Sequence, residues 1–293
     1  AMLGSDSSHT DAYCELTNLG KSNISRNANV EILWGESFNE TKRKAKKYNI
    51  KSVSKNLQDI NFEDIDLVMV VGRFGDSHKK PAEIAIKNEI ATFVDKPFTN
   101  NLNEARYLVK LAESKNTKLT SFSPLRYASE IISLENHLTK TSRPLNLMIT
   151  SPFITKTVPG EGTKSIYFYS IHAADICLSI VKSRPISVAA RKINKAVMVD
   201  LIFENSSSAI LHLTYDQDEI YNVISFENGQ VNSVDIDPEG NYYENTLDHL
   251  LNFVKEKEIK DKKFHTRQAL YSIHIIDAIE KSLDSNTTIE LSY

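Results

Sequence analysis

The chain has 293 residues, of which 41% are hydrophobic, and its 35 basic and 38 acidic residues give a net charge of −3. This length and composition suit two ordinary domains with buried cores, and the balanced charge gives no electrostatic basis for binding nucleic acid or an anionic membrane. The two cysteines, Cys14 and Cys177, match no metal or disulfide spacing, and no apolar run has the length of a membrane span or the form of a signal peptide, which predicts a cytoplasmic protein without a metal.

Strands and helices alternate through the first 123 residues. Expected strands lie at 2–4, 30–34, 53, 66–71, 91–94 and 118–120, and expected helices at 10–19, 39–48, 81–87 and 103–114. The run 66–71 is almost continuously apolar, which is typical of a strand buried on both faces. The alternation predicts a parallel sheet with right-handed crossovers.

The pattern changes after Ser123. Expected helices lie at 126–138, 169–181, 247–256 and 266–283, and expected strands at 145–153, 186–193, 196–203, 208–215, 219–226 and 288–291. Turn-forming residues, and no helices, separate the four strands between 186 and 226. Consecutive strands of this kind predict an antiparallel sheet, so the second half is expected to be an α+β domain.

The stretch Asp95-Lys96-Pro97-Phe98 follows the strand at 91–94 directly. Lys96 is therefore expected at the carboxyl end of a strand, where open α/β sheets bind ligands. Pro97 fixes φ and lacks an amide donor, so the strand cannot continue through it. The alternative interpretation is a strand-ending turn with an exposed lysine.

Four segments, in this order and spacing, resemble the Gfo/Idh/MocA family, named for glucose–fructose oxidoreductase and inositol dehydrogenase. Asp95-Lys96-Pro97 is similar to the family's E-K-P motif, with Asp in place of Glu, and His78 falls in a loop similar to P-N-x-x-H. Residues 123–127, Ser-Pro-Leu-Arg-Tyr, resemble the segment after the family's sixth strand, and residues 170–175 resemble its H-x-x-D segment.

The resemblance covers essentially the whole chain and implies its architecture and activity. The implied fold class is α/β: an N-terminal Rossmann domain with a doubly wound parallel sheet at 1–123, then an α+β domain with a large open, mostly antiparallel sheet at 124–293. It also implies a homodimer or homotetramer through that sheet, and hydride transfer between NAD or NADP and a CH–OH group of a sugar-like or polyhydroxy substrate. In the family the motif Lys and a later His lie near the nicotinamide, so Lys96 and His172 are the expected catalytic residues.

Residues 4–9, Gly-Ser-Asp-Ser-Ser-His, stand where the family has G-x-G-x-x-G, and only the first glycine is present. Asp6 would repel a pyrophosphate unless it points away. The N-terminus of the following helix can still attract phosphate, and Ser7 can add a donor. The expected cofactor contacts here are Gly4, Ser5, Asp6, Ser8 and His9. The alternative is a strand–turn–helix whose cofactor binding has weakened.

Further cofactor contacts are expected after the second, fourth and fifth strands. Glu36 can reach the adenine ribose 2′-hydroxyl and would disfavour the 2′-phosphate of NADP, which favours NAD; an exposed glutamate at a helix start is the alternative. Arg73 departs from the family's small polar residue and can touch cofactor or an acidic substrate group, or simply be exposed. The remaining contacts expected from these loops are Gly72, Phe74, His78, Asp95, Lys96 and Pro97.

Lys96 and His172 have chemical reasons to act on a hydroxyl. An ammonium can stabilise a developing alkoxide, and burial would lower its pKa and permit proton transfer. His172, expected near the start of a helix whose N-terminus would favour the neutral ring, can move a proton. Asp175, one turn further on, is expected to orient the ring. The alternatives are a buried structural histidine, or a metal pair for which no third ligand is found.

One feature of the family's substrate site is missing. The aspartate that the family often carries four residues before this histidine is Phe168 here, and a glycine pair is replaced by Thr163-Lys164. Lys164, Tyr167 or Tyr169 can substitute for that carboxylate. The expected substrate contacts are Lys96, Arg126, Tyr127, Tyr169, His172 and Asp175, although Arg126 and Tyr127 can equally be structural.

The sequence thus predicts a cytoplasmic NAD(P)-dependent oxidoreductase in which Lys96 polarises the reacting hydroxyl and His172 moves the proton. Phe168 and the lost glycines favour a rival interpretation, a nucleotide-binding sensor or complex subunit without turnover. A third interpretation is an α/β protein that binds a sugar and no nucleotide.

Overall fold

The computed structural model describes the chain except for residues 23–27, 139–143, 155–164, 216–219, 228 and 257–261, and except for the side chains of residues 262–265. The chain forms two compact units, Ala1–Phe122 with Tyr243–Leu270, and Ser123–Tyr242 with Tyr271–Tyr293. The break after Phe122 lies next to the expected one at 123. The segment Tyr243–Leu270, which the sequence assigned to the second domain, groups with the first unit.

The first unit is built on a six-stranded parallel sheet in the order β3-β2-β1-β4-β5-β6. The strands are β1 (Met2–Leu3), β2 (Ile32–Trp34), β3 (Ser52–Val53), β4 (Leu67–Val70), β5 (Ala91–Asp95) and β6 (Leu119–Phe122). The strand order reverses between β1 and β4, which is the crevice where doubly wound sheets bind dinucleotides. The predicted Rossmann architecture is therefore confirmed.

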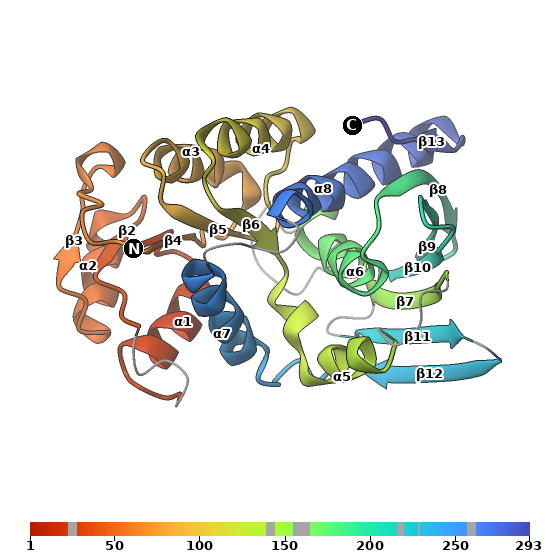
Figure 1. Cartoon of the computed structure of the whole chain (residues 1–293), viewed down its shortest axis with the longest axis horizontal. Helices are drawn as coiled ribbons and strands as arrows, with labels where there is room; N and C mark the ends of the chain where they lie inside the picture. The colour runs from red at the N-terminus through yellow and green to blue at the C-terminus, as the bar shows by residue number, and fades with distance from the viewer. Residues whose placement is uncertain (23–27, 139–143, 155–164, 216–219, 228, 257–261) are drawn as a thin grey trace. The chain divides into compact units, whose positions relative to one another are not determined.

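Helices cover both faces of this sheet. They are α1 (Ser8–Thr17), α2 (Phe38–Lys47), α3 (Lys79–Lys87), α4 (Leu102–Lys115) and α7 (Tyr242–Lys255), with short 3₁₀ turns η2 (Leu57–Asp59) and η3 (Gly75–Ser77). Figure 1 shows α3 and α4 on one face and α1 and α7 on the other. Helix α1 starts two residues before the predicted position because the Ser7 hydroxyl accepts the His9 amide and caps it.

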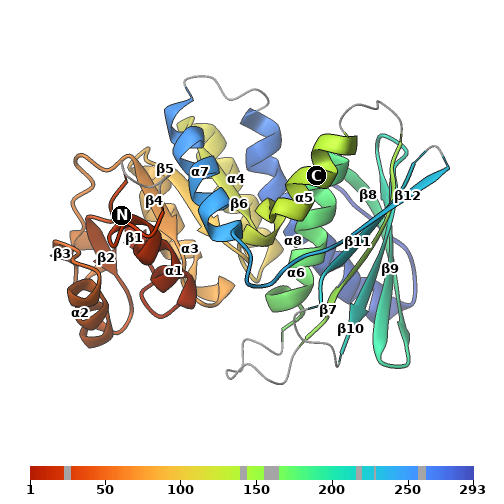
Figure 2. The ribbon, with the colours of Figure 1, turned by 90° about the horizontal axis from the view of Figure 1, so that it is seen from below.

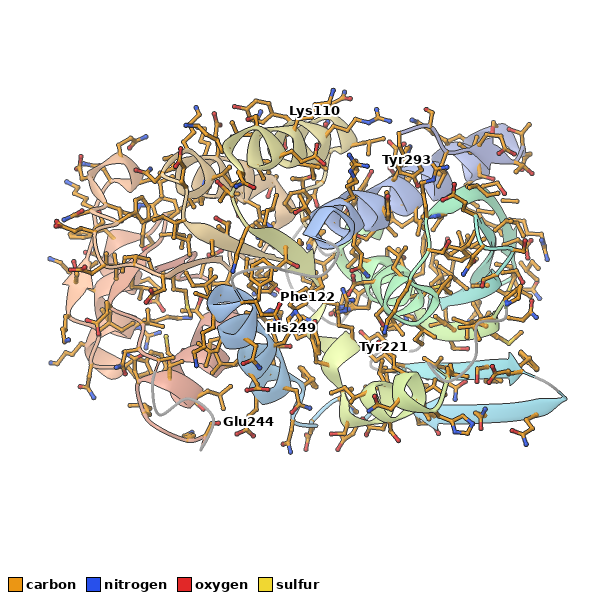
Figure 3. The ribbon with its side chains drawn as sticks, in the orientation of Figure 1. Lys110, Phe122, Tyr221, Glu244, His249 and Tyr293 are labelled. Atoms are coloured by element: carbon orange, nitrogen blue, oxygen red, sulfur yellow. The ribbon has the colours of Figure 1, made fainter. Side chains whose placement is uncertain are left out.

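Helix α7 packs against β6, which explains why this late segment belongs to the first unit. The His249 ring meets Phe122 edge-on with centroids 5.7 Å apart (Figure 3). The Lys118 Nζ donates to the carbonyl oxygens of Phe253 at 2.8 Å and Val254 at 3.0 Å. A lysine at these positions satisfies helix-terminal carbonyls that have no partner within the helix.

The second unit is built on a seven-stranded sheet in the order β12-β11-β7-β10-β9-β8-β13. Its strands are β7 (Asn146–Pro152), β8 (Pro185–Ile193), β9 (Ala196–Phe203), β10 (Ser208–Thr214), β11 (Asn222–Glu227), β12 (Gln230–Asp235) and β13 (Ile289–Glu290). Among the described strands of this second sheet, only the β7–β10 pair is parallel. The large, mostly antiparallel sheet is thus confirmed, although the polar strand β12 was not predicted.

Helices α5 (Ser129–Leu138) and α6 (Ile166–Val181) lie on one face of this sheet (Figure 2), and α8 (Lys262–Ser285) runs from the first unit into the second. Residues of β9 alternate, so that Val199 and Leu201 are buried towards the helices while Ile202 is 42% exposed on the other face. The helix predicted at 126–138 is divided into a 3₁₀ turn η4 (Pro124–Tyr127) and α5, because Ala128 between them has ψ 142°.

Candidate functional site

The loops that follow β1, β2 and β4 approach one another very closely in the first unit. Gly4 has φ +124°, and a Cβ on it would lie 2.2 Å from the backbone nitrogen of Gly72. A Cβ on Gly35 would lie 1.9 Å from the Ser5 Oγ. Side chains cannot be accommodated at such distances, so two glycines let the backbones of three loops meet at the strand-order reversal.

Two serines of the loop before α1, Ser5 and Ser7, form hydrogen bonds within the protein. The buried Ser5 hydroxyl bonds Thr41 Oγ1 at 2.7 Å, and Ser7 caps the helix. Asp6 and Ser8 are exposed. The charge of Asp6 therefore remains in solvent, as phosphate binding at this helix N-terminus would require.

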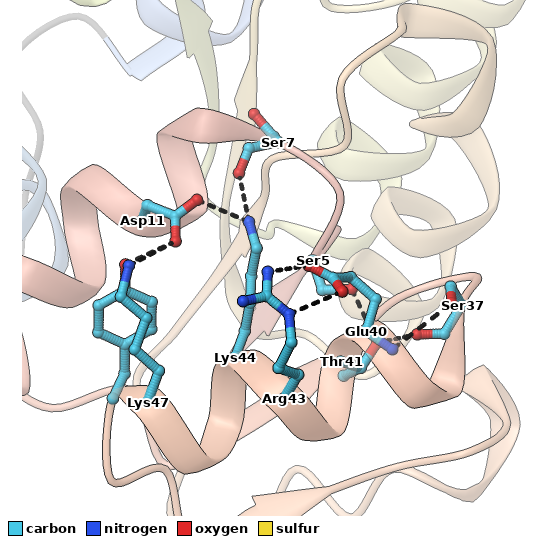
Figure 4. A network of polar contacts seen from close by, with 10 residues as sticks. Ser5, Ser7, Asp11, Ser37, Glu40, Thr41, Arg43, Lys44 and Lys47 are labelled. Carbon is cyan, nitrogen blue, oxygen red and sulfur yellow. Dashed lines mark hydrogen bonds and ion pairs between the residues drawn. The ribbon is translucent and has the colours of Figure 1, made fainter.

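Side chains of α2 hold this loop in place (Figure 4). The buried Lys44 Nζ donates to the Ser7 carbonyl oxygen at 3.0 Å and to Asp11 Oδ2 at 2.7 Å. The Tyr48 hydroxyl donates to Asp11 Oδ1 at 2.5 Å. Burial raises the pKa of Asp11, but the bonds from Lys44 and Tyr48 outweigh it, and this pKa lies below its usual value. Hydrogen bonds from these side chains thus fix the position of the loop that lacks two of the family's glycines.

A cleft of about 540 Å³ opens at the carboxyl end of β2 within the first unit. Glu36 is exposed in this cleft and also lines a small hollow shared with Gly4, Asp6 and Gly72. The cleft is lined by Trp34, Glu36, Lys55, Asn56, Leu57, Gln58, Asp76, Ser77, Lys79, Lys80, Pro81 and Glu104. Glu36 thus lies between the loop before α1 and a cleft of a size suited to a small molecule.

The turn after β5 places Asp95 and Lys96 in the interior, where they are 2% and 7% exposed, and the Lys96–Pro97 peptide bond is cis. His78 is fully buried, with Nδ1 2.8 Å from the Pro97 carbonyl oxygen and Nε2 2.8 Å from that of Gly72. Carbonyl oxygens only accept, so an imidazolium donates both bonds and a neutral ring only one. Either way, His78 ties the loops after β4 and β5 together.

His9, an expected cofactor contact, forms an ion pair through Nδ1 with Asp95 Oδ2. The edge of the Tyr243 ring packs against it, with centroids 5.1 Å apart. Burial raises the pKa of Asp95, but the charge of His9 and its bond outweigh burial and hold this pKa below its usual value. His9 is thus committed to the turn after β5 through one ring nitrogen.

Burial also shapes the chemistry of Lys96. It lowers the pKa of this amine, Asp95 opposes the shift, and the positive charge of Arg73 adds to it, so that the pKa lies below its usual value. The Arg73 guanidinium itself lies 5.7 Å from the centre of the Phe74 ring. A lysine with a lowered pKa at the carboxyl end of a sheet strand can exchange a proton.

The second unit holds a separate buried cluster around His172. The Ser123 Oγ lies 2.6 Å from His172 Nδ1, and the Ser123 amide donates to Asp175 Oδ2 at 2.9 Å. The Arg126 Nη1 lies 3.5 Å from Asp175 Oδ1. Burial raises the pKa of Asp175 to about 6, although Arg126 and the Ser123 amide lower it.

Two expectations for His172 need correction. Helix α6 begins at Ile166, three residues earlier than predicted, so His172 lies in the second turn, beyond the reach of the helix N-terminus. Asp175 bonds Ser123 and Arg126, and Ser123 rather than Asp175 lies within hydrogen-bond distance of the His172 ring. Sequence reasoning missed Ser123, although a serine directly before a proline is a recognisable cap, here of η4.

Aromatic side chains complete this cluster. The ring of Tyr221 lies edge-on to His172 with centroids 5.5 Å apart, and Tyr169 lies at 6.2 Å. Phe168 is buried, with its ring centroid 5.0 Å from that of Tyr169, and Tyr167 is also buried. Arg126 lies 5.6 Å from the centre of the Tyr127 ring. Thr163 and Lys164 lie outside the described residues. Tyr169 is therefore the described candidate nearest to His172 for replacing the missing carboxylate.

Within the described residues, no group of three or more His, Cys, Asp or Glu side chains could hold a metal ion. Cys14 and Cys177 are buried free thiols, and burial raises both pKa values, that of Cys14 to about 12. Among the helices of the described part of the chain, none combines the length and apolar character of a membrane span.

Comparison with known proteins agrees with this architecture. Residues 12–122 match the model of the oxidoreductase family with an NAD-binding Rossmann fold, GFO_IDH_MocA. These residues belong to the Gfo/Idh/MocA oxidoreductase family. The resemblance predicted from the sequence is thus confirmed over the stretch that contains the Lys96 segment, whereas the His172 segment lies outside the matched residues.

Similar proteins are dehydrogenases and oxidoreductases. The chain is 35% identical over 102 residues to the uncharacterized oxidoreductase YdgJ of Escherichia coli K12, a match that covers 35% of this chain and 29% of that protein. The scyllo-inositol dehydrogenase of Lactobacillus casei, solved with NAD(H) and scyllo-inositol, has a TM-score of 0.78 at 12% identity, over 99% of this chain and 97% of that one. The myo-inositol dehydrogenase of Corynebacterium glutamicum has a TM-score of 0.76 at 14% identity, over 100% and 98%. At these identities the likeness shows the shared fold.

Proposed function

We propose that this chain is an NAD-dependent oxidoreductase that acts on a CH–OH group of a sugar-like or polyhydroxy compound. The observation that carries the proposal is the buried Lys96, at the carboxyl end of β5 in an NAD-binding family domain, with a lowered pKa. An amine in that state can stabilise an alkoxide or exchange its proton. If Lys96 only formed part of a turn at the end of the strand, burying its side chain would cost free energy without any functional gain.

The first unit fits a dinucleotide despite its missing glycines. Gly4 and Gly72 let the loops after β1 and β4 approach so closely that a Cβ on Gly4 would overlap the backbone of Gly72, and the charge of Asp6 is in solvent. The pyrophosphate would lie at the N-terminus of α1 near Ser8. When bound, the nicotinamide supplies the hydride acceptor.

Glu36 favours NAD over NADP in this proposal, because its carboxylate can accept from a ribose 2′-hydroxyl and repels a 2′-phosphate. It lines the cleft at the carboxyl end of β2. Lys55, Lys79 and Lys80 line the same cleft, and they would favour the phosphate instead. Comparing the dissociation constants of NAD and NADP decides between these contributions.

The second unit would supply the substrate contacts. Arg126, Tyr127, Tyr169, His172 and Asp175 are proposed to bind hydroxyls around the reacting carbon, with His172 touching the reacting oxygen. The inositol dehydrogenase with a similar fold was solved with scyllo-inositol, which makes cyclitols the first substrates to try.

The exposed face of the second sheet is proposed as the homodimer or homotetramer interface of a cytoplasmic protein. Ile224, Met148 and Ile210 are partners in register across β11, β7 and β10, and all three are half-buried on the face opposite α6. An apolar row of this kind is typical of surfaces that associate. Light scattering should give a dimer or larger species, and Ile210→Lys should reduce it; a monomeric wild type would rule the interface out.

Turnover with a panel of polyols and sugar acids tests the main proposal, with Lys96→Ala as the variant and thermal shift with NAD as the control. Wild type should turn over, and Lys96→Ala should lose turnover while still binding NAD. The sensor alternative, which Phe168 and the lost glycines favour, predicts NAD binding and no turnover. A sugar-binding protein without a nucleotide predicts no thermal shift with NAD or NADP.

A further inference from the structure

The hydroxyl of Ser123 contacts the proposed substrate-facing histidine, and no role was assigned to this serine from the sequence. Ser123 is fully buried between the end of β6 and η4. Its three polar groups are all used: the amide donates to Asp175, the carbonyl accepts from the Arg126 amide at 3.1 Å, and the hydroxyl lies between Leu125 and His172. This serine is therefore fixed in one position.

The hydrogen bonds determine which way the Ser123 hydroxyl proton points. The Leu125 amide donates to the Ser123 Oγ at 3.2 Å, so the oxygen already acts as an acceptor there. Among the described residues, His172 Nδ1, at 2.6 Å, is the acceptor within reach of the hydroxyl proton. If Nδ1 carried a proton instead, two donors would point at one buried oxygen whose own proton had no described acceptor, which is costly.

We propose that Ser123 is a positioning residue that donates its hydroxyl proton to His172 Nδ1 and thereby places the proton of the neutral ring on Nε2. The proposal rests on the proposed function, in which the other edge of His172 meets the reacting oxygen. It makes His172 a hydrogen-bond donor to that oxygen. Histidines whose Nδ1 faces a carboxylate or carbonyl have the opposite tautomer and can act as bases at Nε2.

Asp175 holds Ser123 in place by accepting a hydrogen bond from its backbone amide. Its Oδ2 holds the Ser123 amide and its Oδ1 faces Arg126. The carboxylate is thus engaged with the backbone of Ser123, and it fixes the serine, which in turn fixes the ring.

This assignment changes the roles predicted from the sequence, where His172 takes the proton. A neutral ring already protonated at Nε2 cannot accept there. In alcohol oxidation the O–H proton would then pass to the amine of Lys96 as C–O becomes C=O, and a bound nicotinamide would be the acceptor of the hydride that leaves the carbon. Burial lowers the pKa of Lys96, which favours the neutral amine that this step needs.

The tautomer can be measured without substrate. In protein labelled with ¹⁵N-histidine, His172→Gln identifies the His172 ring signals among those of eight histidines. Wild type should show a protonated Nε2 and an unprotonated Nδ1. Ser123→Ala should convert this to a mixture of tautomers or to the Nδ1–H form. Ser170→Ala is the matched control. Ser170 lies on α6, as His172 does, and its buried hydroxyl donates to the Phe153 carbonyl oxygen at 3.1 Å. Removing that hydroxyl should leave the tautomer of the His172 ring unchanged.

Turnover provides the second readout. Ser123→Ala should lower kcat by about 10- to 100-fold, part of the roughly 10²–10⁴-fold that such positioned groups contribute, while Ser170→Ala stays near wild type. An Nδ1–H tautomer in wild type overturns the proposal, as does an unchanged tautomer in Ser123→Ala. The predicted tautomers with no turnover on any polyol would uphold the role of Ser123 and refute the oxidoreductase proposal, so the two failures are distinguishable.

Discussion

Substituting Gly4 with alanine should destabilise the first unit severely, and the structure gives the reason in two parts. The backbone at φ +124° is strained for any residue with a side chain, which costs about 1–3 kcal/mol. The new Cβ would also lie 2.2 Å from the nitrogen of Gly72 and 2.7 Å from the carbonyl carbon of Val71, and backbone atoms cannot swing aside. Overpacking of this kind costs about 1–3 kcal/mol or more, for a total of about 2–6 kcal/mol.

Gly20 provides a matched control for the strain alone. Its φ is +64°, and an added Cβ meets nothing within 4 Å. Gly20→Ala should therefore cost only about 1–2 kcal/mol, the usual cost of a left-handed backbone in a residue with a side chain. Urea denaturation of both variants and wild type measures the difference, which isolates the steric overlap. Equal losses for Gly4→Ala and Gly20→Ala would refute the claim that the loops after β1 and β4 are in contact.

Three further predictions concern single charged side chains. Burial raises the pKa of Asp175 from 3.8 to about 6, so the folded state binds the proton more tightly than the unfolded state. The free energy of unfolding should therefore fall as pH rises from about 4 to 6. Asp175→Asn should flatten that part of the pH dependence, as measured by urea denaturation. Lys44→Met leaves Asp11 without its buried partner and should cost about 1–3 kcal/mol of stability and weaken NAD binding in calorimetry; unchanged NAD affinity would show that the loop before α1 needs no support. Glu36→Ala should improve NADP binding relative to NAD by about tenfold, or about 1.4 kcal/mol, and an unchanged ratio in equilibrium titrations would remove Glu36 from the ribose site.

The fold was largely predictable because its signals are local. Apolar runs such as Leu67–Val70 are short, bounded by turns and separated by helices, and a parallel sheet with crossovers is the arrangement such a series allows. The place of α7 was not predictable in the same way. Its amphipathic pattern predicts a helix, but only the long-range contacts of His249 with Phe122 and of Phe253 with Lys118 assign it to the first unit.

The candidate site was predictable to the extent that a motif places one residue on one strand end. The DKP motif located Lys96 after β5, and the structure places it there, buried. The partner of His172 was not predictable, because the spacing to Asp175 indicates only a shared helix face. Ser123, 49 residues away, occupies the contact instead.

The ion pair of His9 and Asp95 joins two of the positions at which this chain departs from the family's sequence pattern. One stands where the third glycine of the phosphate loop is expected, and the other where the E-K-P motif has glutamate. Restoring only the glycine would leave the buried carboxylate of Asp95 without its ion-pair partner His9, and lengthening only the aspartate would push a carboxylate into the imidazole. A protein engineer who wants a glycine-rich loop here would have to exchange both residues in one step, since each single replacement passes through a less stable intermediate.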